Sequence, residues 1–310
     1  MPAELSYLGR EGARYRFAVG DQAAREGAAG CLSRLGVSKT LSGRLRAQGR
    51  ASLDAGAQIL EISCSHEACQ PQGAQAGPSS PTAAQPLYED DFIFALDKPA
   101  GVLVHGDGTG QATLTDAACA YIASHEALLA PQAVQRLDVP TTGVVLFSKA
   151  VEFQGSFDAL VADHALMTKR YLAVVAGAYP RSHDRIAAEL ARDRHDARKM
   201  RVCAAGAGQA ALTEVERLAV SPDRGASLLL VTLRTGRKHQ IRVHLASKGF
   251  PIMGDALYGA PTSAAKGPLM LHAWREEFTH PITGEQVSIT SPSTERFAAM
   301  FPGLDGLLAV

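Results

Sequence analysis

Apolar positions along the chain follow two periods, and together they predict a sheet-rich fold. Short apolar or alternating runs, which are typical of strands, occupy residues 50–62, 92–97, 144–147, 171–176, 211–220, 227–233, 269–279 and 287–290. Apolar residues at helical spacing predict helices over 37–46, 113–123, 151–161 and 239–248. Strands outnumber helices and do not alternate strictly with them. The pattern therefore predicts an α+β fold with a mixed, largely antiparallel sheet.

Composition divides the chain into three segments. Residues 1–65 combine a short basic helix with small strands and are expected to form one α+β unit. Residues 66–86 contain four prolines and lack periodicity, so they are predicted to be a mobile linker that lets the first unit move. Residues 87–310 hold the remaining predicted elements and form the main domain.

The charge of the chain is balanced overall and uneven locally. The formal net charge is zero, and 46% of the residues are hydrophobic, which is enough for a substantial core. Residues 34–50 carry five Lys or Arg and no acid, and residues 169–201 carry nine Lys or Arg against four Asp or Glu. Local basic clusters within a neutral total fit a protein that binds one folded RNA. Without the motifs described below, ordinary scatter of surface charge would be the favoured interpretation.

Several other classes of protein are not expected. No segment resembles a signal peptide or approaches the roughly 18 apolar residues of a membrane span. Five scattered cysteines are expected to be reduced, as in the cytoplasm. Cys64, His66 and Cys69 lie close together, but a structural zinc site needs four ligands, so no metal is expected. The glycine-rich segment 105–110 lacks the lysine of a phosphate-binding loop, so no nucleotide cofactor is expected.

Two polar segments carry the candidate chemistry. Residues 135–143 read Gln-Arg-Leu-Asp-Val-Pro-Thr-Thr-Gly and place Asp138 beside a cation, just ahead of an apolar strand. Residues 234–244 read Arg-Thr-Gly-Arg-Lys-His-Gln-Ile-Arg-Val-His, with four Lys or Arg and no acid. Such a density of positive charge favours an anion, most commonly nucleic-acid phosphate. Taken singly, the segments are an ordinary turn aspartate and a solvated helix face.

Together these segments resemble the motifs of the RluA-type pseudouridine synthases. The first matches His-Arg-Leu-Asp-x-x-Thr-Ser-Gly with Gln135 in place of histidine, and Thr-Gly-Arg-x-His-Gln-x-Arg-x-His is complete at 235–244. Smaller family signatures match at residues 98–101, 169–175, 249–259 and 271–273. The resemblance spans about 86–301 and implies a pseudouridine synthase domain with a central cleft. Residues 1–65 loosely resemble the S4-like RNA-binding module that is often fused to this family.

The resemblance also implies roles for individual residues. Asp138 corresponds to the catalytic carboxylate, Tyr171 to the active-site tyrosine that stacks on the base, and Arg242 to the arginine that pairs with the carboxylate. The residues expected to bind RNA are Arg136, Arg237, Lys238, His239, Gln240, Lys39, Arg44 and Arg46. For Arg136, filling the space left by a flipped uridine and stiffening the loop by a salt bridge remain open alternatives.

The implied activity is isomerisation of specific uridines in structured RNA through a catalytic aspartate, without a cofactor. The expected substrate is 23S ribosomal RNA, with transfer RNA as the alternative, and the expected state is a cytoplasmic monomer. Asp138 either attacks C1′ or abstracts the 2′ proton. A catalytically idle RNA-binding homologue and a hydrolytic glycosidase are the rival interpretations, and the glycosidase needs a second acid near Asp138. The changes at Gln135 and at Val139–Pro140 imply altered RNA contacts beside Asp138.

Overall fold

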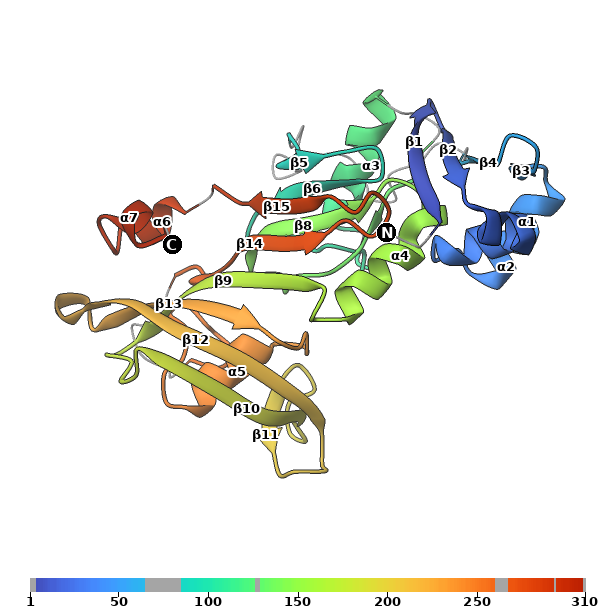
Figure 1. Ribbon diagram of the computed structural model, residues 1–310. Coiled ribbons are helices and arrows are strands. Elements are labelled where there is room, and N and C mark those ends of the chain that lie inside the picture. The colour runs from blue at the N-terminus through green and yellow to red at the C-terminus, as the bar shows by residue number, and fades with distance from the viewer. Residues whose placement is uncertain (1–3, 65–84, 126–128, 260–266, 293, 309–310) are drawn as a thin grey trace.

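The computed structural model describes residues 4–64, 85–125, 129–259, 267–292 and 294–308. The first of these ranges forms a small unit of one antiparallel sheet with strand order β1-β2-β4-β3 and two helices (Figure 1). Its elements are β1 (Leu5–Glu11), β2 (Arg14–Val19), α1 (Asp21–Arg34), α2 (Lys39–Ala47), β3 (Ala51–Asp54) and β4 (Ile59–Ser63). The unit is α+β, as expected, whereas its likeness to the S4 module stays a prediction.

The rest of the chain is built on an 11-stranded sheet with helices packed against it. Its strands are β5 (Tyr88–Glu89), β6 (Ile93–Lys98), β7 (Gln132–Ala133), β8 (Thr142–Ser148), β9 (Met167–Ala176), β10 (His183–Arg192), β11 (Met200–Cys203), β12 (Gln209–Ser221), β13 (Ala226–Leu233), β14 (Leu271–Thr279) and β15 (Gln286–Thr290). Its helices are α3 (Leu114–His125), α4 (Val151–Ala162), α5 (Gln240–Ser247), α6 (Glu295–Ala298), α7 (Leu304–Leu308) and the 3₁₀ turn at Pro222–Arg224.

The sheet joins two halves through a parallel contact. The strand order is β11-β10-β12-β13-β9-β14-β8-β6-β5, and β14 pairs in parallel with β8, whereas the other ladders are antiparallel. At the parallel contact a Cβ on Gly143 would lie 2.1 Å from the carbonyl oxygen of Ala273, and Gly143 has a φ of 115°. Glycine is therefore required where the two halves meet. The predicted mixed, largely antiparallel sheet is confirmed.

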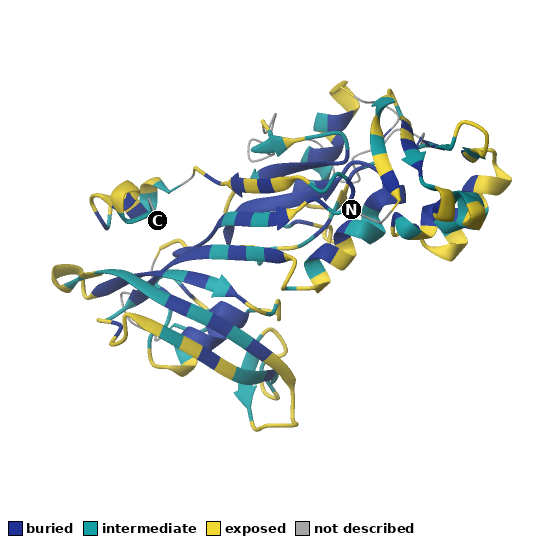
Figure 2. Cartoon of the chain, viewed as in Figure 1, coloured by how far each residue is buried: buried dark blue, intermediate teal, exposed yellow. Residues whose placement is uncertain are grey.

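The core follows the sheet and continues into the helices. Every residue of β8 is buried, and Figure 2 shows the neighbouring strands buried along most of their length. Leu146 and Phe153 belong to one apolar cluster that covers the first half of the sheet and the N-terminal unit. Leu172 and Leu229 belong to a second cluster that packs against α5, α6 and α7. Apolar side chains therefore fill most of the interior of each half.

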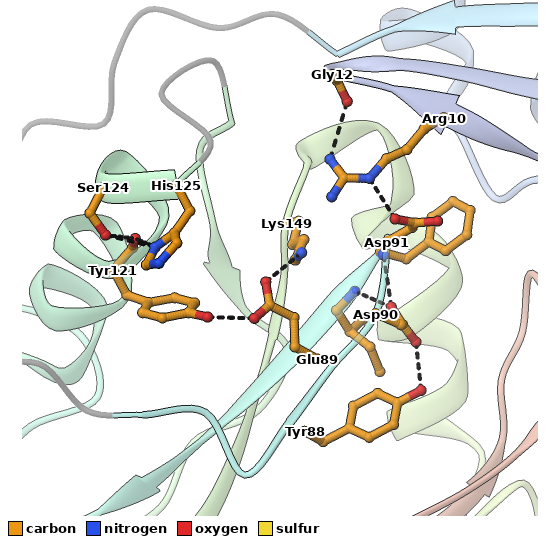
Figure 3. Close-up of polar contacts among 12 residues, drawn as sticks. Arg10, Gly12, Tyr88, Glu89, Asp90, Asp91, Tyr121, Ser124, His125 and Lys149 are labelled. Atoms are coloured by element: carbon orange, nitrogen blue, oxygen red, sulfur yellow. Dashed lines mark hydrogen bonds and ion pairs between the residues drawn. The ribbon is translucent and has the colours of Figure 1, made fainter.

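The N-terminal unit is packed firmly against the main domain. The ring of Tyr15 on β2 contacts Phe92 in a tilted arrangement and Phe153 edge to face, at centroid distances of 5.3 and 4.8 Å. Arg10 Nε donates to Asp91 Oδ1 at 2.6 Å, next to the polar cluster in which Lys149 binds Glu89 (Figure 3). This buried contact corrects the expectation of a freely moving first unit, because separation would expose the aromatic rings to water.

Helix α4 is the part of the main domain that the N-terminal unit contacts most closely. A Cβ on Gly155 would lie 2.1 Å from the carbonyl oxygen of Gly36, so the backbones of α4 and of the loop after α1 almost touch. Arg50 Nη2 donates to Glu152 Oε1 at 2.8 Å, and the Glu152 side chain is fully buried. A buried carboxylate of this kind depends on its partner, so Arg50 belongs to the interface and not to an RNA-binding surface.

Most predicted elements are present. The sequence pattern did not predict β1, β2, α1, β5, β7, the β10–β11 hairpin, α6 or α7. Nearly all of the predicted linker 66–86, with His66 and Cys69, falls outside the described residues. Cys119 forms a disulfide, so the expectation of reduced thiols is wrong at that position, whereas Cys31, Cys64 and Cys203 are free. Within the described ranges, no helix is long and apolar enough to cross a membrane.

Candidate active site

A cavity of about 540 Å³ opens where the two halves of the sheet meet. Its walls come from the loop before β8, from β9, from the end of α4 and from the segment that leads into α5 (Figure 1). The lining includes Gln135, Arg136, Asp138, His164, Lys169, Tyr171, Arg237, His239, Gln240 and Arg242. Segments about one hundred residues apart in the chain therefore meet at one hollow, and all three residues expected to be catalytic are among them.

Asp138 is held from behind by Arg242. Arg242 Nη1 donates to Asp138 Oδ2 at 3.1 Å, and the two side chains are 6% and 22% exposed respectively. The other side of the guanidinium donates to Asp255, from Nε to Oδ2 and from Nη2 to Oδ1, each at 2.8 Å. This paired geometry fixes the plane of the guanidinium. The carboxylate of Asp138 is thereby oriented while it keeps access to the cavity.

The backbone around Asp138 is fixed by a turn and by a buried lysine. Thr141 N donates to the carbonyl oxygen of Asp138 at 3.0 Å, which closes the turn ahead of β8. Lys98 Nζ donates to the carbonyl oxygen of Val139 at 2.9 Å and to that of Val102 at 2.8 Å. Burial lowers the pKa of Lys98 to about 8, against the opposing attraction of Asp138. The Lys-Pro-Ala-Gly segment thus anchors the Asp138 loop from the neighbouring strand.

Tyr171 lies on β9 at the floor of the cavity. It pairs with Val231 of β13 on one side and with Ala273 of β14 on the other, so the ring rises from the middle of the sheet. Burial raises the pKa of Tyr171, and the negative charges of Glu276 and Asp138 raise it further. The hydroxyl therefore stays protonated at neutral pH, and the ring offers an apolar face to a planar ligand.

His239 occupies a strained position beside the carboxylate. Its φ of 55° is left-handed, which is uncommon for a residue other than glycine. His239 Nε2 lies 3.7 Å from Asp138 Oδ1, and Nδ1 lies 2.7 Å from the hydroxyl of Tyr258. Burial lowers the pKa of His239, so the ring is neutral near pH 7 and contributes no full charge to Asp138.

The other residues expected to bind RNA fall into separate groups. Arg136 and Arg237 are exposed and line the cavity, whereas Lys238 is exposed outside that lining. Lys39, Arg44 and Arg46 are exposed on α2 of the N-terminal unit, away from the cavity lining.

Gln240 requires a correction. Its amide oxygen accepts from Thr235 Oγ1 and from Arg237 N, and its nitrogen donates to the carbonyl oxygen of Leu212 and to Thr213 Oγ1. All four hydrogen bonds that the amide can form are internal. Gln240 therefore holds the basic loop in shape and is not free to contact RNA.

Three residues that the sequence pattern did not single out complete the site. Asp255 orients Arg242, Tyr258 contacts His239, and Glu276 is buried on the strand next to Tyr171, whose pKa its charge raises. A signal existed for Asp255 and Tyr258, because both stand in the segment that matches the family at 249–259. Glu276 had no comparable signal, since a single acid in a strand usually faces solvent. Among the described residues, no group of three or more His, Cys, Asp or Glu could hold a metal ion.

Comparisons with known proteins identify the family to which the sequence belongs. Residues 92–247 match the family described as RNA pseudouridylate synthase. Ribosomal large subunit pseudouridine synthase D of Zymomonas mobilis is 32% identical over 228 residues, 69% of this chain and 71% of that protein. The protein of the same name from Nitrosomonas europaea is 33% identical over 231 residues, which is 71% of this chain and 65% of that protein.

The fold comparison points the same way. Human RNA Pseudouridylate Synthase Domain Containing 1 superposes with a TM-score of 0.59 at 23% identity, over 75% of this chain and 90% of that one. Human RNA Pseudouridylate Synthase Domain Containing 4 superposes with a TM-score of 0.54 at 23% identity, over 66% of this chain and 87% of that one. On the sequence match, the chain belongs to the RluA-type family of RNA pseudouridine synthases, which are isomerases that convert uridine to pseudouridine in RNA.

Proposed function

We propose that this protein isomerises uridines in 23S ribosomal RNA and that Asp138 is the reacting carboxylate. The observation that carries the proposal is the contact between Arg242 and Asp138 at the edge of a cavity whose floor is Tyr171. The choice of ribosomal RNA is supported by the relatives named for the large ribosomal subunit. The three residues come from one chain, so the proposal needs no second copy of the protein.

The chemistry needs one carboxylate at the ribose. The N1–C1′ bond of uridine breaks and the base turns. C5 then bonds to C1′, the hydrogen on C5 leaves as a proton, and N1 takes up a proton, so that the composition is unchanged. Asp138 acts either by attack on C1′ or by removal of the 2′ proton. Arg242 orients the carboxylate by donating from Nη1 to Oδ2. Tyr171 stacks on the base, and its protonated hydroxyl relays the C5 proton.

The cavity suits a nucleotide that has left its helix. A volume of about 540 Å³ falls within the usual range for small-ligand sites, and a stacked uridine must flip to enter it. Arg136 and Arg237 at the cavity contact the flanking phosphates. Lys39, Arg44 and Arg46 extend the contact to the body of the RNA, since they are exposed and form no ion pair with a described residue.

A hydrolytic reaction is less well supported, because the second carboxylate near Arg242 is already engaged. Asp255 is 1% exposed. It accepts from Arg242 and from the backbone amides of Leu257 and Tyr258 at 2.8 to 3.1 Å. A general acid must reach the leaving group with a proton to give. Asp255, held as a carboxylate by four donors, has neither the proton nor the access.

Replacement of Asp138 tests the proposal. Asp138→Asn keeps the shape and removes both the nucleophile and the base, so we expect a loss of more than about a thousandfold in turnover, with RNA binding and thermal stability retained. Asp223→Asn, on the exposed turn between β12 and β13, is the matched control. The assay maps pseudouridine in transcripts of 23S ribosomal RNA and, separately, of transfer RNA.

Each outcome of this experiment has a defined meaning. Modification confined to transfer RNA would replace the proposed substrate and leave the role of Asp138 intact. Release of free uracil would show hydrolysis, because isomerisation leaves the RNA mass unchanged. Turnover by Asp138→Asn at a tenth of the wild-type rate would reject Asp138 as the reacting group.

A further inference from the structure

A buried polar cluster lies directly beneath the cavity and takes no part in the chemistry above. It consists of Gln135, Lys169 and Glu276. Glu276 of β14 is paired in register with Lys169 of β9, and the two residues are 1% and 7% exposed. Gln135 and Lys169 line the cavity, whereas Glu276 lies behind them. A carboxyl group in this position has lost almost all of its contact with water, and that loss disfavours its charged form.

Gln135 and Glu276 share one hydrogen bond, and one further oxygen of each side chain has no partner. Gln135 Nε2 donates to Glu276 Oε1 at 2.5 Å. The other two oxygens of the pair, Gln135 Oε1 and Glu276 Oε2, are buried and have no hydrogen-bond partner among the described residues. With an ionised carboxylate both are acceptors, and two buried acceptors without a donor are costly. One added proton resolves the shortage, since a protonated Oε2 can donate to Gln135 Oε1 and close a ring of two hydrogen bonds.

The charges around Glu276 allow this protonated form. Lys169 and Tyr171 face it from β9, Gln135 faces it from the loop before β8, and its register partner on β15 is the apolar Ile289. Burial raises the pKa of Glu276 to about 7, although Lys169 and the bond from Gln135 act in the opposite direction. Burial also lowers the pKa of Lys169, the cation that faces Glu276 from β9.

Gln135 begins the segment that ends at Asp138, so the cluster is mechanically connected to the reacting carboxylate. We propose that Glu276 is a positioning residue that, as a neutral carboxylic acid, clamps Gln135 and thereby sets the Asp138 segment in the cavity. Loss of the proton breaks the hydrogen bond from Glu276 Oε2 to Gln135 Oε1. The ionised carboxylate is then attracted to Lys169. The Asp138 segment then loses its anchor at Gln135. The inference rests on the proposed role of Asp138 and adds a pH-dependent control to that site.

The activity test compares three variants. Glu276→Gln places a second amide opposite Gln135, which preserves both hydrogen bonds and cannot ionise. We expect wild-type turnover to fall as the pH rises through about 7, and we expect Glu276→Gln to lack that decline while it stays within about threefold of wild type at acidic pH. Glu276→Leu, which offers Gln135 no partner, should turn over slowly at every pH.

A neighbouring carboxylate supplies the control. Glu277 lies on the opposite face of β14 and binds Arg170 and Arg275 at 2.6 and 2.9 Å. Glu277→Gln should therefore keep the wild-type pH profile. The readout is single-turnover release of tritium from 23S transcripts that carry 5-tritiated uridine. Superimposable profiles for wild type and Glu276→Gln would overturn the proposal.

A second measurement does not depend on activity. The folded-state pKa of Glu276 lies above its unfolded value, so the folded protein binds more protons between about pH 4.5 and about pH 7, and wild-type stability falls as the pH rises through that window. Glu276→Gln removes this loss. The urea midpoint of the variant should exceed that of wild type by a margin that grows from pH 5 to about pH 7 and is constant above.

The two measurements separate the possible failures. A margin that does not change with pH would show that Glu276 is not a buried neutral acid and would overturn the inference, whatever the result for Asp138. A pH-dependent margin together with an active Asp138→Asn variant would instead reject the proposed function, and the link between Glu276 and catalysis with it.

Discussion

Arg242 binds Asp138 through a single nitrogen, Nη1 to Oδ2 at 3.1 Å, and gives its other donors to Asp255. The guanidinium is almost fully buried, whereas Asp138 remains partly exposed in the cavity. Asp255 therefore acts on the carboxylate of Asp138 through Arg242, in the way that supporting residues orient the groups of a site. This arrangement makes the planar geometry of the guanidinium at position 242 more important than its positive charge alone.

Arg242→Lys should separate charge from geometry. An ammonium group carries the same charge but cannot donate in a planar fork to Asp255 while it also reaches Asp138. We expect turnover to drop by at least about tenfold, or about 1.4 kcal/mol in activation free energy, with a lower urea midpoint as well. Single-turnover kinetics at saturating RNA measure the first effect. Arg275→Lys, at the ion pair with Glu277, is the control and should behave as wild type. Unchanged turnover in Arg242→Lys would contradict the assigned geometry.

Tyr171→Phe should stop the reaction late. The ring still stacks on the base, but no hydroxyl remains to relay the C5 proton, so RNA that has lost its original N1–C1′ bond should accumulate without tritium release. Electrophoresis of denatured enzyme–RNA mixtures and mass spectrometry detect such species. Tyr179→Phe is the control, because the Tyr179 hydroxyl donates to Asp184 at 2.9 Å, away from the cavity lining. Normal product formation by Tyr171→Phe would show that the hydroxyl of Tyr171 takes no part in the reaction.

Charge reversal on α2 should weaken RNA binding without slowing the chemistry. Arg44→Glu with Arg46→Glu removes two exposed cations, and the salt slope of binding falls by about 0.7 to 0.9 for each phosphate that is no longer neutralised. The dissociation constant should rise while turnover at saturating RNA stays constant. Arg25→Glu on α1 is the control for a change in net charge. Equal affinity and equal salt slope in the double variant would make α2 a structural element only. Reversal is preferable to deletion of the unit, which would uncover Phe92 and Phe153.

The sequence motifs predicted that Asp138, Tyr171 and Arg242 lie together, and the three residues do line one cavity, whereas their catalytic roles stay a prediction. Their supporting residues were harder to find. Asp255 and Glu276 are single acids whose importance depends on which strand lies next to them, and a one-dimensional pattern does not contain that information. Gln240 shows the opposite error. It belongs to a matching motif, but its side-chain amide forms only internal hydrogen bonds.

The elements that were not predicted have a similar explanation. Strand β2 does alternate, with Tyr15, Phe17 and Val19 buried, but its exposed positions carry arginines that resemble a basic segment. Strand β10 buries only Ile186 and Leu190 over its length, so its period is too sparse to recognise. The five cations of residues 34–50 were counted as one surface, whereas Arg34 binds Glu26 and Arg50 binds Glu152. Only the three-dimensional contacts show which cations of such a segment are held in ion pairs and which remain exposed.

Because the N-terminal unit packs tightly on α4, the distance between α2 and the cavity is fixed. One stretch of α4 touches the backbone at Gly36, and its last turns carry Asp158 and Val161 into the wall of the cavity. The separation between α2 and Asp138 is therefore set by one continuous apolar core. If one RNA contacts both α2 and Asp138, as proposed above, its uridine must lie at that fixed distance from α2. We then expect the target to be selected by the length and bend of the intervening RNA.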